Sequence, residues 1–205
     1  MDSIIFDLDG TLWDSRRTVS KAWSEVVKRT PYAEGEVTEE DLKGTMGLQI
    51  REISKKLFPY LDEEHQLELI KECCKNEQIY LTKEGGQLFE GIENVLEKLS
   101  QKYKLFIVSN CEEGYIESFY SYHKLEKYFL DFENPGRTKL SKGENIQLII
   151  DRNHLNSPVY VGDTQGDRDA AAYAGIRFVY AEYGFGDVDS YDYKIEDMSD
   201  LLKLF

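Results

Sequence analysis

Short apolar runs alternate with amphipathic segments over most of this chain. The apolar runs have the length of buried β-strands and end near positions 6, 109, 132, 162 and 180. Between them, apolar residues recur at helical spacing over residues 92–99, 115–122, 143–152 and 167–174. Because strands and helices alternate, the pattern predicts an α/β fold with a parallel sheet and helices on both faces.

One long segment interrupts this alternation. Over residues 15–84 the apolar positions have only helical spacing, beginning with Val19 and continuing at i+3, i+4, i+7 and i+8. Further helical stretches follow Gly47 and Asp62, and the block ends before the paired glycines at 85–86. The pattern therefore predicts an all-helical insertion after the first strand.

The insertion divides the chain into two predicted domains, an α/β core of residues 1–14 and 85–205 and a helical domain of residues 15–84. Hinges are expected near Asp14 and at the paired glycines 85–86. We also expect the inserted helices to pack on each other and to form a small core of their own. The residues expected there are Val19, Trp23, Val26, Ile53, Leu57, Leu67 and Ile70.

Composition and charge narrow the class of protein. The 205 residues are 41% hydrophobic and 13% aromatic, which is ample for a packed core. A net charge of −14 argues against a nucleic-acid backbone or an anionic membrane as partner. No apolar run approaches the ~20 residues of a membrane span, no signal peptide precedes the first strand, and three cysteines make no disulfide framework. A cytoplasmic protein is expected.

The candidate chemistry begins where the first strand ends. Asp7 and Asp9 are two residues apart and are followed by Gly10, which permits a sharp turn. Residues two apart in an extended chain point the same way, and open α/β sheets bind ligands at the carboxyl ends of their strands. Two carboxylates this close repel each other as anions, so a divalent cation or a bound proton is expected there.

Three further segments follow in a consistent order. Ser109 and Asn110 come directly after an apolar strand, and their hydroxyl and amide groups suit an anionic oxygen. Lys142 precedes an amphipathic helix and is preferred over Lys139 as the cation of the site. The fourth segment, which begins Val161-Gly162-Asp163 and contains Asp167, follows another apolar strand.

Together these four segments resemble the motifs of the haloacid dehalogenase-like phosphohydrolase superfamily. The resemblance implies a Rossmann-like core and a helical cap that closes over the site and selects the substrate. The loop Tyr183-Gly184-Phe185-Gly186 is similar to one found in phosphoglycolate phosphatase-like members. The dehalogenase branch of the superfamily lacks an aspartate at the position of Asp9, so the resemblance favours a phosphatase.

The resemblance also implies roles for these residues. Asp7 would be the nucleophile that forms an aspartyl-phosphate, and Asp9 the general acid and then the general base. Thr11 would hydrogen-bond near the two carboxylates and hold Asp9 in place. The groups that bind the phosphoryl oxygens and balance their charge would be Ser109, Asn110 and Lys142.

A magnesium ion and a small phosphate ester are implied as well. The ion's ligands would be Asp7, the main-chain carbonyl of Asp9, and Asp163, with Asp167 either ligating through water or orienting a ligand. Arg51, shortly after Gly47, matches a segment that carries a substrate-contacting arginine in some relatives. An arginine on a solvated helix face is an equally good interpretation.

Two other functions remain open at this stage. A phosphomutase of the β-phosphoglucomutase kind shares the cap and the core, although Thr11 favours a hydrolase. A binding module that signals through phosphorylation of Asp7 also uses an acidic pair and a lysine, but the large insertion after the first strand suits substrate enclosure better. The sequence indicates neither the physiological substrate nor the oligomeric state.

Overall fold

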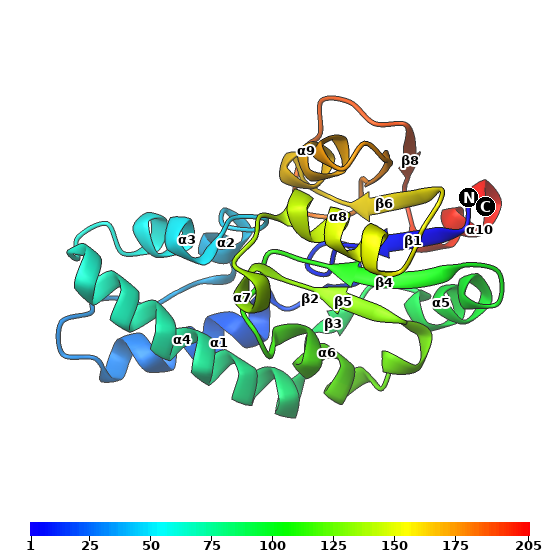
Figure 1. Ribbon diagram of the computed structural model, residues 1–205. Coiled ribbons are helices and arrows are strands. Elements are labelled where there is room, and N and C mark those ends of the chain that lie inside the picture. The colour runs from blue at the N-terminus through cyan, green and yellow to red at the C-terminus, as the bar shows by residue number, and fades with distance from the viewer.

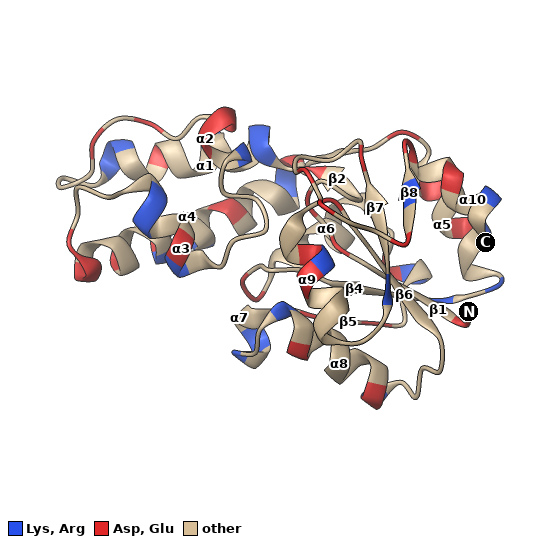
Figure 2. Cartoon of the chain, turned by 90° about the horizontal axis from the view of Figure 1, so that it is seen from above, with Lys and Arg blue, Asp and Glu red and all other residues tan.

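A computed structural model describes all residues 1–205 and confirms the predicted α/β fold. Figure 1 shows a parallel sheet with helices on both faces and a group of helices that extends away from one end of the sheet. Acidic residues are spread over both parts of the molecule, as the red segments of Figure 2 show. None of the helices is long and apolar enough to cross a membrane.

Six parallel strands form the sheet in the order β5-β4-β1-β6-β7-β8. They are β1 (Ser3–Phe6), β4 (Lys104–Val108), β5 (Asp131–Glu133), β6 (Pro158–Gly162), β7 (Arg177–Ala181) and β8 (Tyr193–Ile195). The chain first builds outward from β1 through β4 to β5, and then returns to the other side of β1 with β6. The strand order therefore reverses at β1, where α/β sheets form their ligand sites.

Successive residues of the central strands serve opposite faces of the sheet. Ile5, Phe106 and Tyr160 pack with two helices on one face, α8 (Lys142–Arg152) and α9 (Gln165–Tyr173). Their neighbours Ile4 and Leu105 pack on the other face. The helices there are α5 (Ile92–Ser100) and α6 (Tyr115–His123). Because both faces are covered, these strands are apolar throughout rather than alternating with polar residues.

The strand predicted to end at position 132 is displaced towards the C-terminus. A 3₁₀ turn, η1 (Glu126–Tyr128), occupies its expected start, and β5 begins only at Asp131. Phe129 is buried while Leu130 is 66% exposed, so only part of this apolar run is buried before β5 pairs with β4. Several short elements were not predicted, since they carry too few residues to show a period, among them α7 (Pro135–Thr138), β8, η2 (Met198–Asp200) and α10 (Leu201–Leu204).

The segment between β1 and the rest of the sheet is helical, as predicted. Its helices are α1 (Arg16–Arg29), α2 (Glu39–Lys43), α3 (Ile50–Leu57) and α4 (Glu63–Glu84), of which α2 was not foreseen. A two-stranded antiparallel ribbon connects this segment to the sheet, and it pairs β2 (Trp13–Asp14) with β3 (Gln87–Leu88). The ribbon lies beside both predicted hinges.

The expectation of a separate core for the inserted helices is wrong. Val19, Trp23 and Ile70 belong to one continuous apolar cluster that also contains Phe119 of α6 and residues of the sheet. Leu67 is 37% exposed and lies outside it. The reason is the length of α4, which packs against α1 and then runs on along α6 (Figure 1).

Candidate active site

Three loops that follow neighbouring strands meet at one edge of the sheet. Asp7 follows β1, Ser109 follows β4, and Asp163 follows β6, with β1 between the other two strands. All three residues are buried. The parallel arrangement thus brings together side chains that lie about 50 to 150 positions apart in the sequence, which is the juxtaposition expected at a switch point.

Lys142 connects two of the carboxylates. Its Nζ lies 2.8 Å from Oδ1 of Asp7 and 2.5 Å from Oδ1 of Asp167, and the lysine is only 5% exposed. It is the first residue of α8, whose start is secured by a capping box. Lys139, the alternative, donates to the main-chain carbonyl of Gly136 instead. The structure therefore places Lys142 in the buried network.

Three buried carboxylates form a compact group of oxygen donors. Oxygens of Asp7, Asp163 and Asp167 lie within 4.8 Å of one another. Gly10 makes this approach possible, because a Cβ at that position would lie 2.1 Å from Oδ2 of Asp163 and the backbone φ is +81°. Oxygen donors of this kind suit a hard divalent cation.

The two aspartates after β6 differ in how their oxygens are used. Oδ1 of Asp167 accepts from Lys142, and its Oδ2 accepts from both the N–H and the hydroxyl of Thr164. Oδ2 of Asp163 accepts from the N–H of Phe185 at 2.7 Å, in the aromatic loop noted above. Asp163 thus keeps acceptor capacity for a further ligand, whereas both oxygens of Asp167 are occupied.

The electrostatics of this group leave it short of positive charge. Burial raises the pKa of Asp7 to about 6, although Lys142 acts in the opposite direction. Burial also raises the pKa of Asp163 well above its usual value, and Asp167 and Asp7 add to the rise. Burial opposes the charge on Lys142, but the two aspartates hold the pKa of this lysine well above its ordinary value. One ammonium among three carboxylates leaves room for a cation.

Asp9 is held by a different set of partners. Its Oδ1 accepts hydrogen bonds from the Ser15 hydroxyl at 2.6 Å and from the Tyr115 hydroxyl at 3.0 Å. The Tyr115 hydroxyl also lies 2.8 Å from the Ser15 oxygen. Burial raises the pKa of Asp9 to about 7, and the charge of Asp7 contributes, while both hydroxyls lower it. Such a carboxyl exchanges its proton readily near neutral pH.

The expectation that Thr11 holds Asp9 differs from the geometry. The Thr11 hydroxyl instead faces Oδ1 of Asp163 at 3.5 Å, because the turn after Gly10 directs it towards β6. Ser15 and Tyr115, which do hold Asp9, were not identified from the sequence. Tyr115 follows Asp9 by 106 positions and carries no spacing signal.

The loop after β4 contacts the inserted segment. Asn110 donates from Nδ2 to the main-chain carbonyl of Gly47 at 2.8 Å. On its other side Gly47 lies against α9, since a Cβ there would be 3.0 Å from Oγ1 of Thr164, and its φ is +78°. The turn before α3 is therefore seated between two loops of the core, directly over the site.

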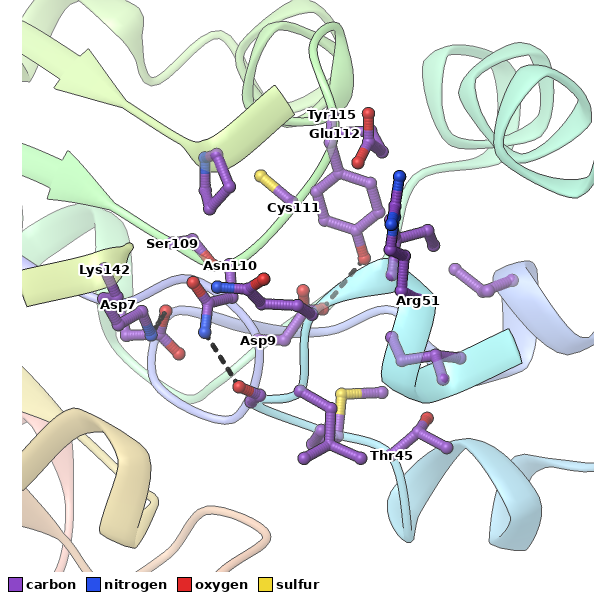
Figure 3. A pocket seen from close by; sticks show the side chains of 18 of the residues that line it. Asp7, Asp9, Thr45, Arg51, Ser109, Asn110, Cys111, Glu112, Tyr115 and Lys142 are labelled. Atoms are coloured by element: carbon purple, nitrogen blue, oxygen red, sulfur yellow. Dashed lines mark hydrogen bonds and ion pairs between the residues drawn. The ribbon is translucent and has the colours of Figure 1, made fainter. Parts of the chain in front are cut away.

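A cavity of about 500 Å³ lies under this turn. Asp7, Ser109 and Lys142 line one end of it, and apolar side chains of α1, α2 and α3 line the other. Arg51, near the start of α3, is exposed and contributes to the lining, as Figure 3 shows. The structure thus brings Arg51 to the same cavity as Asp7, Ser109 and Lys142, which represent the first three sequence motifs.

Glu77 of α4 also lines this cavity and was missed in the sequence. Its carboxylate accepts from the indole N–H of Trp23 at 2.7 Å, and burial raises the pKa of Glu77 to about 8. A signal was present: Ile70, Cys74 and Leu81 are buried at helical spacing, and Glu77 occupies the next position on that face. An acidic residue at a position where the helical periodicity predicts a buried apolar residue indicates a functional role.

Known proteins share the whole of this architecture. A family profile described as "Haloacid dehalogenase-like hydrolase" matches residues 4–181. The chain is 26% identical to a phosphoglycolate phosphatase of Aquifex aeolicus, over 100% of this chain and 96% of the relative. It is 28% identical to one of Aliivibrio fischeri, over 89% and 84% respectively. A solved haloacid dehalogenase-like hydrolase from Streptococcus pneumoniae superposes with a TM-score of 0.86 at 22% identity, over 100% of this chain and 98% of that one.

Proposed function

Because this chain belongs to the haloacid dehalogenase-like hydrolase family and is a phosphatase within it, we propose that it hydrolyses a small phosphate monoester with Mg²⁺ through an aspartyl-phosphate. The observation that carries the proposal is Asp7 at the end of the cavity, 2.8 Å from Lys142 and two residues before Asp9. A nucleophile, a cation and a proton carrier are what phosphoryl transfer requires.

In the proposed reaction Asp7 attacks phosphorus, and the bond from phosphorus to the leaving oxygen breaks. Asp9 gives its proton to that oxygen and later takes one from the water that hydrolyses the intermediate. Lys142 balances the charge of Asp7 and of the phosphoryl group, and Ser109 and Asn110 supply hydrogen-bond donors to its oxygens. A carboxyl that is partly protonated at neutral pH suits both tasks of Asp9.

The carboxylates fit the proposed magnesium ion. Asp7 and Asp163 would hold it with the main-chain carbonyl of Asp9, since Asp163 keeps unused acceptor capacity. Asp167 would orient Lys142, because both of its oxygens are already engaged. When bound, the ion neutralises negative charge on the transferring phosphoryl group.

Residues 15–84 would act as a cap over this site. The contact of Gly47 with Asn110 and Thr164 supports this, since it seats the inserted segment on the core loops beside Asp7. Opening at the β2–β3 ribbon would admit the substrate, and closure would exclude water.

The proposal is tested by replacing the nucleophile. The variant Asp7→Asn should abolish release of phosphate from p-nitrophenyl phosphate while leaving the circular dichroism spectrum unchanged, and Asp187→Asn, which lies outside the network, should retain activity. Turnover in ¹⁸O-labelled water should place label on the Asp7 carboxylate. Absence of label there, with sustained turnover, would show direct attack by water. A hexose 1-phosphate that is isomerised without free phosphate would identify a mutase.

A further inference from the structure

Glu77 is a buried acid without a cation. It lies in the middle of α4, is 5% exposed, and borders the cavity that contains Asp7 and Asp9. One oxygen accepts from the Trp23 indole, which orients the carboxyl group between α4 and α1. The charged groups that act on it most, Asp9 and Glu112, are themselves acidic. Burial of a carboxyl group here costs folding free energy unless the group binds a ligand or makes a contact that stabilises the packing of the helices.

A neighbouring residue shows what a stabilising contact between these two helices requires. Asn76, the residue before Glu77, also bridges α4 to α1, by donating from Nδ2 to the carbonyl of Ala22 at 2.8 Å. Asn76 is buried but does not line the cavity, so a neutral amide is enough to tie the two helices together. Glu77 differs because it adds an ionisable oxygen at the cavity wall.

The cations that line the cavity do not compensate Glu77. Lys142 is bound to two aspartates, and Lys139 donates to a main-chain carbonyl. Arg51 is the remaining one and is exposed, while Glu112 adds a second acid to the lining. The end of the cavity away from Asp7 is therefore poorly suited to a leaving group that carries its own carboxylate.

Building on the proposed function, we propose that Glu77 is a specificity-determining residue that binds a hydrogen-bond donor, a hydroxyl or an ammonium, on the leaving group of the phosphate ester. Glu77 accepts from that donor through the oxygen that the Trp23 indole does not hold, and the Cys74 thiol is a further neighbour of this carboxyl group. The apolar wall formed by Val19, Leu42 and Ile53 covers the carbon chain between the donor and the phosphate.

This assignment predicts a substrate preference that differs from the one implied by the names of the relatives. They are named phosphoglycolate phosphatases, and phosphoglycolate carries a carboxylate in its leaving group. A carboxylate enclosed at this end of the cavity would lie beside Glu77 and Glu112 with no buried cation to compensate its charge, and such burial is costly. We therefore expect this protein to discriminate against phosphoglycolate in favour of esters with a neutral or positive terminal group.

The experiment compares matched esters in the full-length protein with Mg²⁺. The substrates are straight-chain alkyl phosphates of increasing length that end in a methyl, a hydroxyl, an ammonium or a carboxylate group. At the best chain length, kcat/KM for the hydroxyl or ammonium ester should exceed that for the methyl ester by about tenfold, as one good hydrogen bond allows. The carboxylate ester should be the poorest of the four.

Variants then identify the side chain responsible. Glu77→Leu should bring the ratio between donor-bearing and methyl esters to about one, whereas Asn76→Ala, which removes a bond between the same helices, should leave the ratio unchanged. Because each ratio is taken within one preparation, partial unfolding cancels. Glu77→Gln keeps the shape of the side chain but removes its charge, and so distinguishes the two kinds of donor. If the variant keeps the preference for donor-bearing esters over the methyl ester, the donor is a hydroxyl; if the preference is lost, the donor is an ammonium.

The outcomes distinguish this inference from the proposed function. If neither p-nitrophenyl phosphate nor any alkyl ester is hydrolysed, the proposed function is wrong. If the esters are hydrolysed but the methyl or carboxylate ester is preferred, or if Glu77→Leu keeps the wild-type ranking, then Glu77 is a structural residue and the assignment is overturned.

Discussion

The carboxyl groups along the cavity fall into two sets that are neutralised differently. Around Asp7 the acids are compensated by Lys142, which contacts two of them directly. Around Asp9 and Glu77 no lysine or arginine is in contact, and the carboxyls are held by neutral hydroxyl and indole groups. In the set around Asp7, charge is retained for binding a cation and a phosphoryl group. In the set formed by Asp9 and Glu77, burial raises the pKa of Asp9 to about 7 and that of Glu77 to about 8, so protons take the place of cations.

Removing the cation from the set around Asp7 should have the largest effect. In Lys142→Met, Asp7 and Asp167 lose their buried counter-ion, and we expect phosphatase activity to fall by about a thousandfold or more and stability by about 3–5 kcal/mol. Activity assays and urea unfolding measure the two losses. Lys139→Met is the matched control and should change neither by much. Near-normal activity in Lys142→Met would assign the cationic role to another residue.

Removing a proposed metal ligand comes next. Asp163→Asn should raise the Mg²⁺ concentration needed for half-maximal activity by about 100-fold, because one charged ligand is lost. Asp187→Asn should leave the Mg²⁺ titration unchanged. A chelator should abolish the activity of the wild type. Full activity in metal-free buffer contradicts the magnesium site.

The proton-neutralised set is tested by the pH dependence of stability. The pKa of Glu77 is raised from 4.5 to about 8 on folding, so the folded state binds the proton more tightly. The stability that this provides is complete below pH 4.5 and is lost as pH rises through 8. Relative to Glu77→Gln, the wild type should lose about 4 kcal/mol of unfolding free energy between pH 5 and pH 9, measured by urea unfolding. Parallel curves for the two proteins would show that Glu77 stays ionised.

A smaller effect is expected at Asp9. The Tyr115 hydroxyl stabilises the ionised form of Asp9, so Tyr115→Phe should raise the pKa of this carboxyl. The alkaline limb of the pH profile of kcat should shift to higher pH by about half a pH unit to one unit, as the loss of one hydrogen bond allows. Tyr122→Phe, on the exposed side of the same helix, is the control. A lower rate with an unshifted profile would leave Tyr115 a structural role only.

The smallest effect concerns Arg51. Because this arginine is exposed, Arg51→Ala should raise KM for a doubly anionic ester by at most about tenfold and should spare p-nitrophenyl phosphate. The preference that depends on Glu77 should persist in this variant. An equal loss on both substrates, or none on either, would leave Arg51 a surface residue.

Local patterns were enough to predict the fold and the place of the motifs. Apolar runs of strand length before Asp7, Ser109 and Asp163 indicated a parallel sheet, and the carboxyl ends of such strands lie at one edge. Patterns were insufficient where an element is short or where an apolar run leaves the sheet, as at β5 and β8. The separate helical core was wrong because periodicity shows which face of α4 is buried but not which helix covers it.

The sequence by itself determined which side chains stand at the ends of the strands, because the place of each strand along the chain and the alternation of its side chains follow from local periodicity. Only the tertiary structure decided which groups face them across the cavity. Asp9 meets Tyr115 across 106 positions, and Glu77 meets Trp23 across 54. These pairings depend on how α4 and α6 pack on their neighbours, and that packing is set by the fit of many side chains together rather than by any local pattern.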